Sequence, residues 1–189
     1  MKQTDEERGA AAGGGPEIPH VPGAIRRAIR QSRPFRAPSQ EALIGILVAA
    51  ERLRRNVTLV VEPYGVSYQQ YNVLRILRGA QPDPLATLEI GSRMIETTPG
   101  VTRLLDRLEE KGWVERKRCT EDRRQVHCRI TPAGLDLLAE LDPLVERLDE
   151  RIGEVLPPDQ MQTLLTLLNE VIEACDARAF TESSEDGTA

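Results

Sequence analysis

Residues 97–131, with the sequence TTPGVTRLLDRLEEKGWVERKRCTEDRRQVHCRIT, decide the expected fold. In the first half of this stretch, apolar residues recur at spacings of three and four, which is the period of an amphipathic helix. They are Val101, Leu104, Leu105 and Leu108. Thr98 followed by Pro99 is a typical helix start, and Gly112 is typical of the position just after a helix end. The pattern predicts a helix over about residues 97–111.

The period changes after this helix. Residues 113–119 and 125–130 are two short runs of strand-forming residues, and they flank the polar segment 120–124. This order predicts a β-hairpin. Arg123 and Arg124 would lie at its tip, so the tip is expected to be cationic.

A second, shorter helix is expected to follow Thr87, and a tight turn would separate it from the helix over 97–111. Two helices joined in this way form a helix-turn-helix, whose second helix can lie in the major groove of DNA. The hairpin would form a wing, whose arginines can reach phosphates or the negative potential of a narrow minor groove. The sequence therefore predicts a winged helix-turn-helix that binds double-stranded DNA.

The expected recognition helix leaves its polar residues on the exposed side. They are Thr98, Thr102, Arg103, Asp106 and Arg107. Arg103 is long enough to bind guanine O6 and N7 or a phosphate, and Thr102 can donate to a phosphate or contact a thymine methyl. Thr97 and Thr98 stand at the helix start, where backbone N–H groups favour phosphate. Asp106 has the alternative role of pairing with a neighbouring arginine.

Helical stripes of apolar residues flank this domain on both sides. One helix is expected after Ser39, a good N-cap, and another from Ser67 to Gly79. The region after Thr131 carries a long stripe that Pro143 is expected to kink or break. A last helix should follow Pro157 and Pro158. These stripes pack most simply against other helices, including those of a partner subunit.

The expected fold is mainly α, a winged helix-turn-helix with a small β-hairpin wing and an N- and C-terminal helical dimerisation domain. The chain should divide into a flexible, arginine-containing extension (1–38), a helical dimerisation region (39–66 and 132–175), a DNA-binding domain (67–131) and an acidic flexible tail (176–189).

The formal net charge of −5 does not argue against DNA binding, because the charge is unevenly distributed. Residues 24–36 contain five arginines and no acidic residue. Residues 114–131 contain six Arg or Lys and three acidic residues, a net of +3. The arginines from Arg26 to Arg36 have two interpretations, as a solvated arm or as a contact to DNA phosphates or a partner subunit.

Several classes of protein are not expected. The sequence has no run of about 18 apolar residues, and its first 16 residues lack the apolar core of a signal peptide, so we expect a cytoplasmic protein without a membrane span. Three cysteines, an odd number, do not make a secreted disulfide framework. There is no P-loop, nucleophile elbow or metal-ligand cluster, so neither enzymatic activity nor a cofactor or metal is expected.

Cys119 and Cys128 fall on the two expected wing strands. They could approach closely enough for a disulfide, which would make the wing redox-sensitive, and His127 adds a candidate metal ligand. The simpler interpretation makes both cysteines small, partly buried strand residues. For the whole chain, the alternative to DNA binding is a protein-interaction module that uses its winged helix to hold another protein.

Four stretches resemble the MarR family of bacterial transcriptional regulators. They are VTRLLDRLEEKGWVER (101–116), EDRR (121–124), ITPAG (130–134) and QQYNVLRIL (69–77). The resemblance covers about residues 39–175. It implies a dimer formed by the N- and C-terminal helices, binding to palindromic operators, usually repression, and often release by a small aromatic ligand.

The resemblance also implies roles for particular residues. The family's wing motif Asp-x-Arg falls on Asp122 and Arg124, where the arginine enters the minor groove and the aspartate orients basic side chains. The family's effector lies between the dimerisation and DNA-binding regions, which makes Tyr64, Tyr68 and Tyr71 candidate pocket residues. This sequence departs from the family at Pro99 and Gly100, where small polar or basic residues are common, so Thr98, Thr102 and Arg103 must carry more of the base readout.

Overall fold

The computed structural model describes residues 23–96, 100–119 and 125–176. Residues 23–149 form one compact unit, and residues 150–176 belong to a second one. None of the described helices combines the length and apolarity that crossing a membrane requires.

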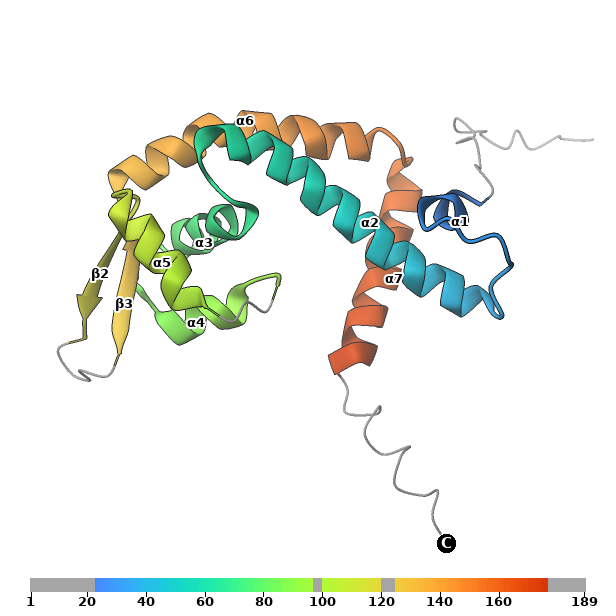
Figure 1. Cartoon of the computed structure of the whole chain (residues 1–189), viewed down its shortest axis with the longest axis horizontal. Coiled ribbons are helices and arrows are strands. Elements are labelled where there is room, and N and C mark those ends of the chain that lie inside the picture. Colours follow the sequence, from blue (N-terminus) through green and yellow to red (C-terminus); the bar gives the residue numbers. More distant parts are fainter. Residues whose placement is uncertain (1–22, 97–99, 120–124, 177–189) are drawn as a thin grey trace, which may run out of the picture. The chain divides into compact units, whose positions relative to one another are not determined.

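The described chain is mainly helical, as expected, with one small sheet (Figure 1). In chain order the elements are α1 (Ala24–Ala28), α2 (Pro38–Val61), the 3-10 turn η1 (Glu62–Tyr64), α3 (Tyr68–Gly79), β1 (Leu85–Ala86), α4 (Thr87–Arg93), α5 (Val101–Glu110), β2 (Val114–Arg118), β3 (Val126–Ile130), α6 (Pro132–Gly153) and α7 (Pro158–Asp176). The order helix, helix, hairpin of the predicted winged helix-turn-helix is therefore present as α4, α5 and β2–β3.

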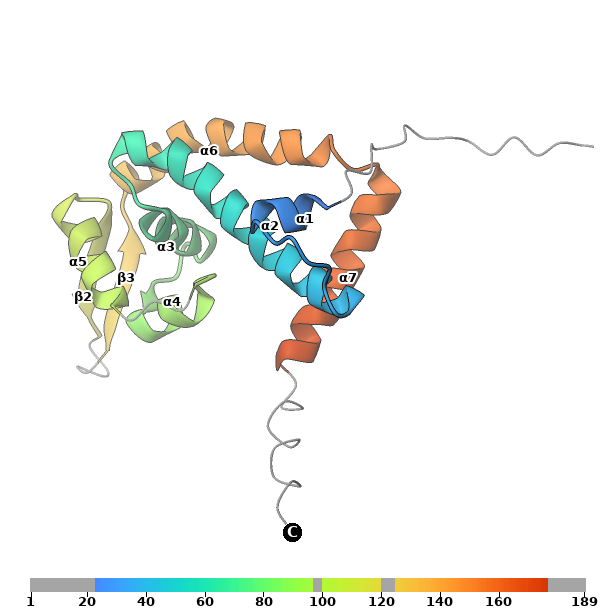
Figure 2. The same ribbon diagram turned by 45° about the vertical axis from the view of Figure 1, so that its right-hand side comes forward.

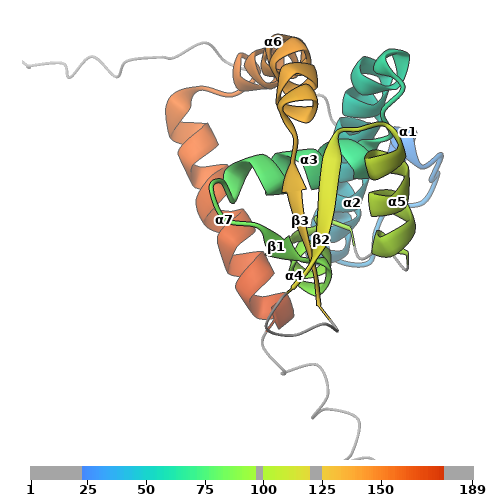
Figure 3. The same cartoon turned by 90° about the vertical axis from the view of Figure 1, so that its left-hand side faces the viewer.

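The sheet is antiparallel with the strand order β1-β3-β2 (Figure 3). In the hairpin, Val114 pairs with Ile130 and Arg116 pairs with Cys128. β1 adds a third strand, in which Leu85 pairs with Cys128. β1 was not predicted from the sequence, because two residues are too few to show a period of two.

The core of the unit 23–149 gathers around α3 and is closed by α5, α6 and the inner face of the sheet. Its fully buried side chains are Val61, Val66, Val73, Leu74, Ile90, Leu105, Leu108, Val114, Cys128, Leu138 and Leu141. Leu105 and Leu108 belong to α5, which confirms the predicted buried face of that helix.

Two helix starts are fixed by side-chain caps. The Ser67 hydroxyl accepts the N–H of Gln70 (3.2 Å), and the Gln70 side chain accepts the N–H of Ser67 (3.1 Å), so both ends of this capping box satisfy a helix-end donor. At α6, the Thr131 hydroxyl accepts the N–H of Gly134 (3.1 Å) and donates to the carbonyl of Gly112 (2.7 Å). The predicted starts after Ser67 and Thr131 are confirmed.

Residues 24–28 form a helix inside the segment that was expected to be flexible. Figure 2 shows α1 beside α2. A Cβ atom added to Gly45 of α2 would lie 2.7 Å from Cδ1 of Ile25. The missing side chain at Gly45 therefore lets Ile25 pack against α2, which holds the arginine-rich segment against the helix.

Two further helices differ from the prediction. α2 begins at Pro38 with Ala37 as its N-cap rather than Ser39, because proline is well suited to the first helical turn. α6 runs without a break through Pro143. Leu138, Leu141 and Val145 are buried on both sides of the proline, and this packing keeps the helix continuous where local propensity favoured a break.

Candidate nucleic-acid interface

α5 begins later than the sequence suggested. Its N-cap is Gly100, which has φ 126°, and the helix starts at Val101. That backbone conformation is one that residues with a side chain rarely adopt, so position 100 needs glycine. The departure from the family at this position therefore has a conformational reason. Thr97 and Thr98 lie outside the described residues.

The exposed face of α5 carries the described candidates for DNA contact. Thr102, Arg103 and Arg107 are exposed, while Leu105 and Leu108 on the other face are fully buried. Within the described residues, neither Arg103 nor Arg107 forms an ion pair with a carboxylate. Both guanidinium groups are thus available to a ligand.

The wing is joined to α5 by an ion-pair network centred on Arg116 of β2. Its Nη2 atom lies 2.7 Å from Oδ1 of Asp106 and 2.7 Å from Oε2 of Glu109, and its Nε donates to the same Glu109 oxygen at 2.8 Å. The hydrogen bond with Glu109 is the largest cause that raises the pKa of Arg116. Asp106 therefore has the alternative role considered for it, as the partner of an arginine.

We expect the Arg116 network to appear as a coupling free energy between β2 and α5. Arg116→Ala should lower the free energy of unfolding by about 1–2 kcal/mol, because a partly buried charged hydrogen bond is lost. Urea unfolding of Arg116→Ala, Glu109→Ala and the double variant would measure the coupling, expected at about 0.5–1 kcal/mol. Strictly additive effects would contradict the network.

Cationic side chains also occupy the strands of the wing. Lys117, Arg118 and Arg129 are exposed. Asp122, Arg123 and Arg124, the residues predicted for the wing tip, lie outside the described residues. The sequence places them between β2 and β3, and their role in DNA binding stays a prediction.

The two wing cysteines do not form the disulfide that was considered as an alternative. The N–H of Cys119 donates to the carbonyl of Gln125 (3.0 Å), whereas Cys128 pairs with Arg116, so the two cysteines are three residues apart in register. Because side chains alternate along a strand, they also lie on opposite faces of the sheet. Cys128 is fully buried, and burial raises the pKa of its thiol.

His127 does not gather metal ligands around it. The part of the chain that the structure describes holds no group of three or more His, Cys, Asp or Glu side chains suited to a metal ion.

A second site lies within the unit 23–149, beside α2. This cavity of about 510 Å³ is lined by Leu47, Ala50, Glu51, Leu53, Arg54, Val57, Tyr68, Ile95 and Glu96. Of the three tyrosines proposed for a ligand pocket, only Tyr68 lines it, and burial raises its pKa. Tyr71 is a core residue, 4% exposed, because it shares a helix face with buried Leu74. Tyr64 lies in the turn η1 and does not reach the cavity.

The cavity has one charged corner. Nη2 of Arg54 lies 2.8 Å from Oε2 of Glu51, and its Nε lies 3.5 Å from Oε1 of Glu96. The side-chain amide of Gln69 donates to Glu96 at 3.3 Å. Glu96 belongs to the segment that leads into α5, so the charged corner connects α2 to that segment. Arg54 and Glu96 were not predicted as site residues, because charged residues in helix-forming or polar stretches give no local sign that they lie close together in the fold.

Comparison with known proteins gives a consistent result. Residues 66–126 match the profile of the MarR family. The chain is 30% identical over 139 residues to the HTH-type transcriptional regulator PrsX of Escherichia coli, covering 72% of this chain and 83% of PrsX. Among solved structures, it is similar to a MarR transcription factor from Planctomyces limnophilus (36% identity, TM-score 0.55, 72% of this chain and 98% of that one). It is also similar to NadR in complex with 4-hydroxyphenylacetate (27% identity, TM-score 0.60, 74% of this chain and 97% of that one).

Proposed function

The chain belongs to the MarR family and is a DNA-binding transcriptional regulator, and from this premise we propose that it is a cytoplasmic, dimeric repressor of a palindromic operator, released by a small aromatic ligand. The observation that carries the proposal is the division of α5 into a buried apolar face and an exposed face with Thr102, Arg103 and Arg107. A helix held in this way can present its polar side chains to the edges of base pairs.

In this proposal α5 lies in the major groove. Arg103 binds a guanine or a phosphate, Thr102 contacts the backbone or a thymine methyl, and Arg107 binds a phosphate. Thr97 and Thr98 contact phosphates near the start of the helix. At the wing, Arg124 enters the minor groove, Arg123 binds phosphate and Asp122 orients the basic side chains.

Apolar faces without a described partner support the dimer. α2 exposes Leu43 (53%) and Leu59 (61%). α7 buries none of its residues and exposes Leu167 (53%) and Ile172 (57%). Exposed apolar surface of this kind on long helices is typical of a subunit interface. A two-fold dimer would also place two copies of α5 on the two halves of a palindrome.

The cavity beside α2 supports regulation by a ligand. Its apolar walls suit an aromatic ring, while Arg54 and Tyr68 offer a cation and a hydroxyl to polar substituents. NadR, a relative of this chain, has been crystallised with 4-hydroxyphenylacetate, an aromatic acid. A carboxylate that bound Arg54 would compete with Glu96 and loosen the segment that leads into α5. Such competition would link ligand binding to the loss of DNA binding.

Arg54→Gln should abolish the response to aromatic acids, because it removes the cation and keeps a similar volume. It should also weaken operator binding in the absence of ligand, because it breaks the contact between Arg54 and Glu96. The measurement is titration with 4-hydroxyphenylacetate and related acids, followed by calorimetry and by release of a labelled operator. Arg55→Gln is the matched control, since Arg55 is exposed on the same helix and does not line the cavity. An equal response from wild type and Arg54→Gln would contradict the role of Arg54.

The proposed function is tested by selecting bound duplexes from a random DNA pool. We expect an inverted repeat whose half-sites lie about one helical turn, roughly 10 base pairs, apart, with two chains bound per duplex. Transcription from a promoter that contains the selected site should fall when the protein is added. A pool without an enriched motif would favour the protein-interaction module instead, and a rise in transcription would indicate an activator.

A further inference from the structure

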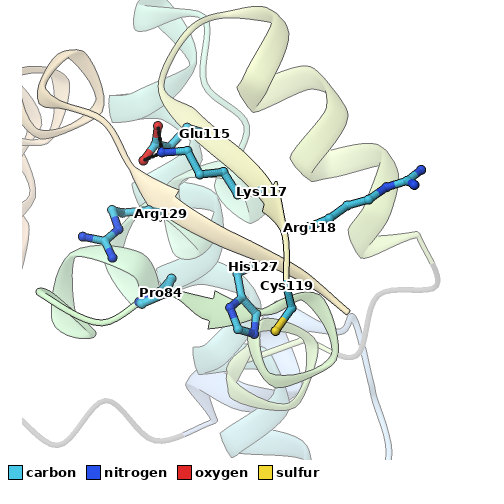
Figure 4. Close-up of a pocket in the computed structure, with 7 residues that line it drawn as sticks. All are labelled: Pro84, Glu115, Lys117, Arg118, Cys119, His127 and Arg129. Atoms are coloured by element: carbon cyan, nitrogen blue, oxygen red, sulfur yellow. Dashed lines mark hydrogen bonds and ion pairs between the residues drawn. The ribbon is translucent and has the colours of Figure 1, made fainter. Parts of the chain in front are cut away.

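The outer face of the wing sheet carries a cationic surface that the proposed function does not use. Side chains alternate along β2 and β3, so those next to buried Val114, Cys128 and Ile130 point away from the core. They are Glu115, Lys117, Cys119, His127 and Arg129, and they line an open pocket of about 560 Å³ together with Pro84 and Arg118. The Arg118 side chain itself extends to the opposite side of the strand (Figure 4). We use the name outer wing face for Glu115, Lys117, Cys119, His127 and Arg129.

The outer wing face has an excess of positive charge. Lys117 and Arg129 stand against one carboxylate, that of Glu115, whose Oε2 lies 3.3 Å from Nζ of Lys117. The Lys117 side chain is nevertheless 77% exposed. Within the described residues, Arg129 forms no ion pair. The surface can therefore accept an anion without first breaking a buried contact.

The position of this surface indicates which anion it meets. α5 packs on β2 through Arg116, whose side chain lies on the inner side of the sheet with Asp106 and Glu109. The outer wing face points the other way, as Lys117, His127 and Arg129 show in Figure 4. With α5 in the major groove, a phosphate bound on this face would lie outside the base pairs that α5 contacts, further along the duplex.

We propose that the outer wing face binds backbone phosphates of the DNA that flanks the operator. The inference rests on DNA binding by this chain, and the surface extends the DNA-binding wing without a break. Lys117 binds a phosphate through its compact ammonium group, and Arg129 binds one through its planar guanidinium group, which can donate two parallel hydrogen bonds. Their contribution is independent of sequence, because phosphates carry no base information. The flanking contacts lengthen the region of DNA covered by each subunit.

The test compares two duplexes with the same selected operator. The short one ends at the operator, and the long one adds about one helical turn of neutral sequence on each side. Fluorescence anisotropy over a range of salt concentrations gives the affinity and its salt slope. Wild type should bind the long duplex more tightly and with a steeper slope. Lys117→Gln/Arg129→Gln should lose that difference, with a slope on the long duplex smaller by about 1.8 for two lost phosphates, and should bind the short duplex like wild type.

Two further variants sharpen the result. Arg52→Gln/Arg147→Gln removes the same charge from exposed positions on α2 and α6 and should keep the length effect. Glu115→Gln removes the one carboxylate of the outer wing face and should strengthen binding to the long duplex only, a gain that misfolding cannot produce.

Three outcomes would overturn the proposal. Equal binding of both duplexes by wild type would show that no flanking contact exists. An equal loss on both duplexes in Lys117→Gln/Arg129→Gln would place these residues on the operator itself. Tighter DNA binding by that variant would show that an acidic segment, such as residues 176–189, occupies the surface instead. Failure of wild type to bind either duplex would refute operator binding itself, and is distinct from all three.

Discussion

Gly134→Val is expected to lower the free energy of unfolding by about 3 kcal/mol or more, at the upper end of what overpacking a core costs. A Cβ atom at position 134 would clash with the carbonyl oxygen of Trp113 and would lie 2.8 Å from Cγ1 of Ile130. The Trp113 carbonyl cannot easily move away, because it accepts the N–H of Thr131 at 3.0 Å. The junction between the hairpin and α6 must therefore distort.

Gly79→Ala is the matched control for this substitution. Gly79 ends α3, and an added Cβ there meets no atom within 4 Å. It should leave stability unchanged or raise it by up to about 1 kcal/mol, because alanine reduces the entropy of the unfolded chain. Urea unfolding followed by circular dichroism measures both variants. A Gly134→Val protein as stable as Gly79→Ala would mean that the backbone around Trp113 yields at little cost.

Arg103→Ala and Arg124→Ala are each expected to weaken operator binding by about five- to 150-fold, which corresponds to about 1–3 kcal/mol. Arg103 is exposed on α5, and its loss should relax sequence preference at one operator position if it binds a guanine. Arg124 lies outside the described residues, and its expected effect follows from the family's wing motif. Band-shift titrations on the selected operator and on single-base variants of it measure both effects.

Arg147→Ala serves as the control for lost positive charge, since Arg147 is exposed on α6, away from the α5 face. Circular dichroism should show the same fold for all three variants, because Arg103 and Arg147 are exposed and Arg124 belongs to the polar segment between β2 and β3. A phosphate contact should also reduce the salt slope of binding by about 0.9. Unchanged affinity in both Arg103→Ala and Arg124→Ala would remove these residues from the DNA interface.

Local signals in the sequence were sufficient for the elements that position the site. The spacing of Val101, Leu104 and Leu108 predicted which face of α5 is buried, since a helix built on one apolar stripe has only one stable orientation against a core. The start of α3 was predictable because Ser67 and Gln70 satisfy each other's backbone groups within four residues. Neither inference needed knowledge of another part of the chain.

The side-chain contacts that could not be predicted from the sequence depend on strand register or join residues that are far apart along the chain. The sequence left open whether Cys119 and Cys128 meet, because one residue of register moves a side chain to the opposite face of a sheet. Arg116 was not recognised because its partners on α5 become neighbours only when the hairpin packs against that helix. Arg54 and Glu96 are far apart in the sequence, and only the packing of α2 near the end of α4 brings them into one cavity.

Thr131 joins three elements at one point. Its hydroxyl donates to the carbonyl of Gly112, in the turn that ends α5, and its backbone N–H donates to the carbonyl of Trp113, just before β2. The same hydroxyl accepts the N–H of Gly134 and so caps α6. Because Arg116 also bridges α5 and β2, hydrogen bonds and ion pairs connect the recognition helix, the wing and the start of α6 into one DNA-binding unit. In a dimer, a ligand could then alter the distance between two such DNA-binding units without changing the structure of either unit. The dimer would then be sensitive to the spacing between the two half-sites. Inserting or deleting a single base pair between them should impair recognition even when every contacted base is retained.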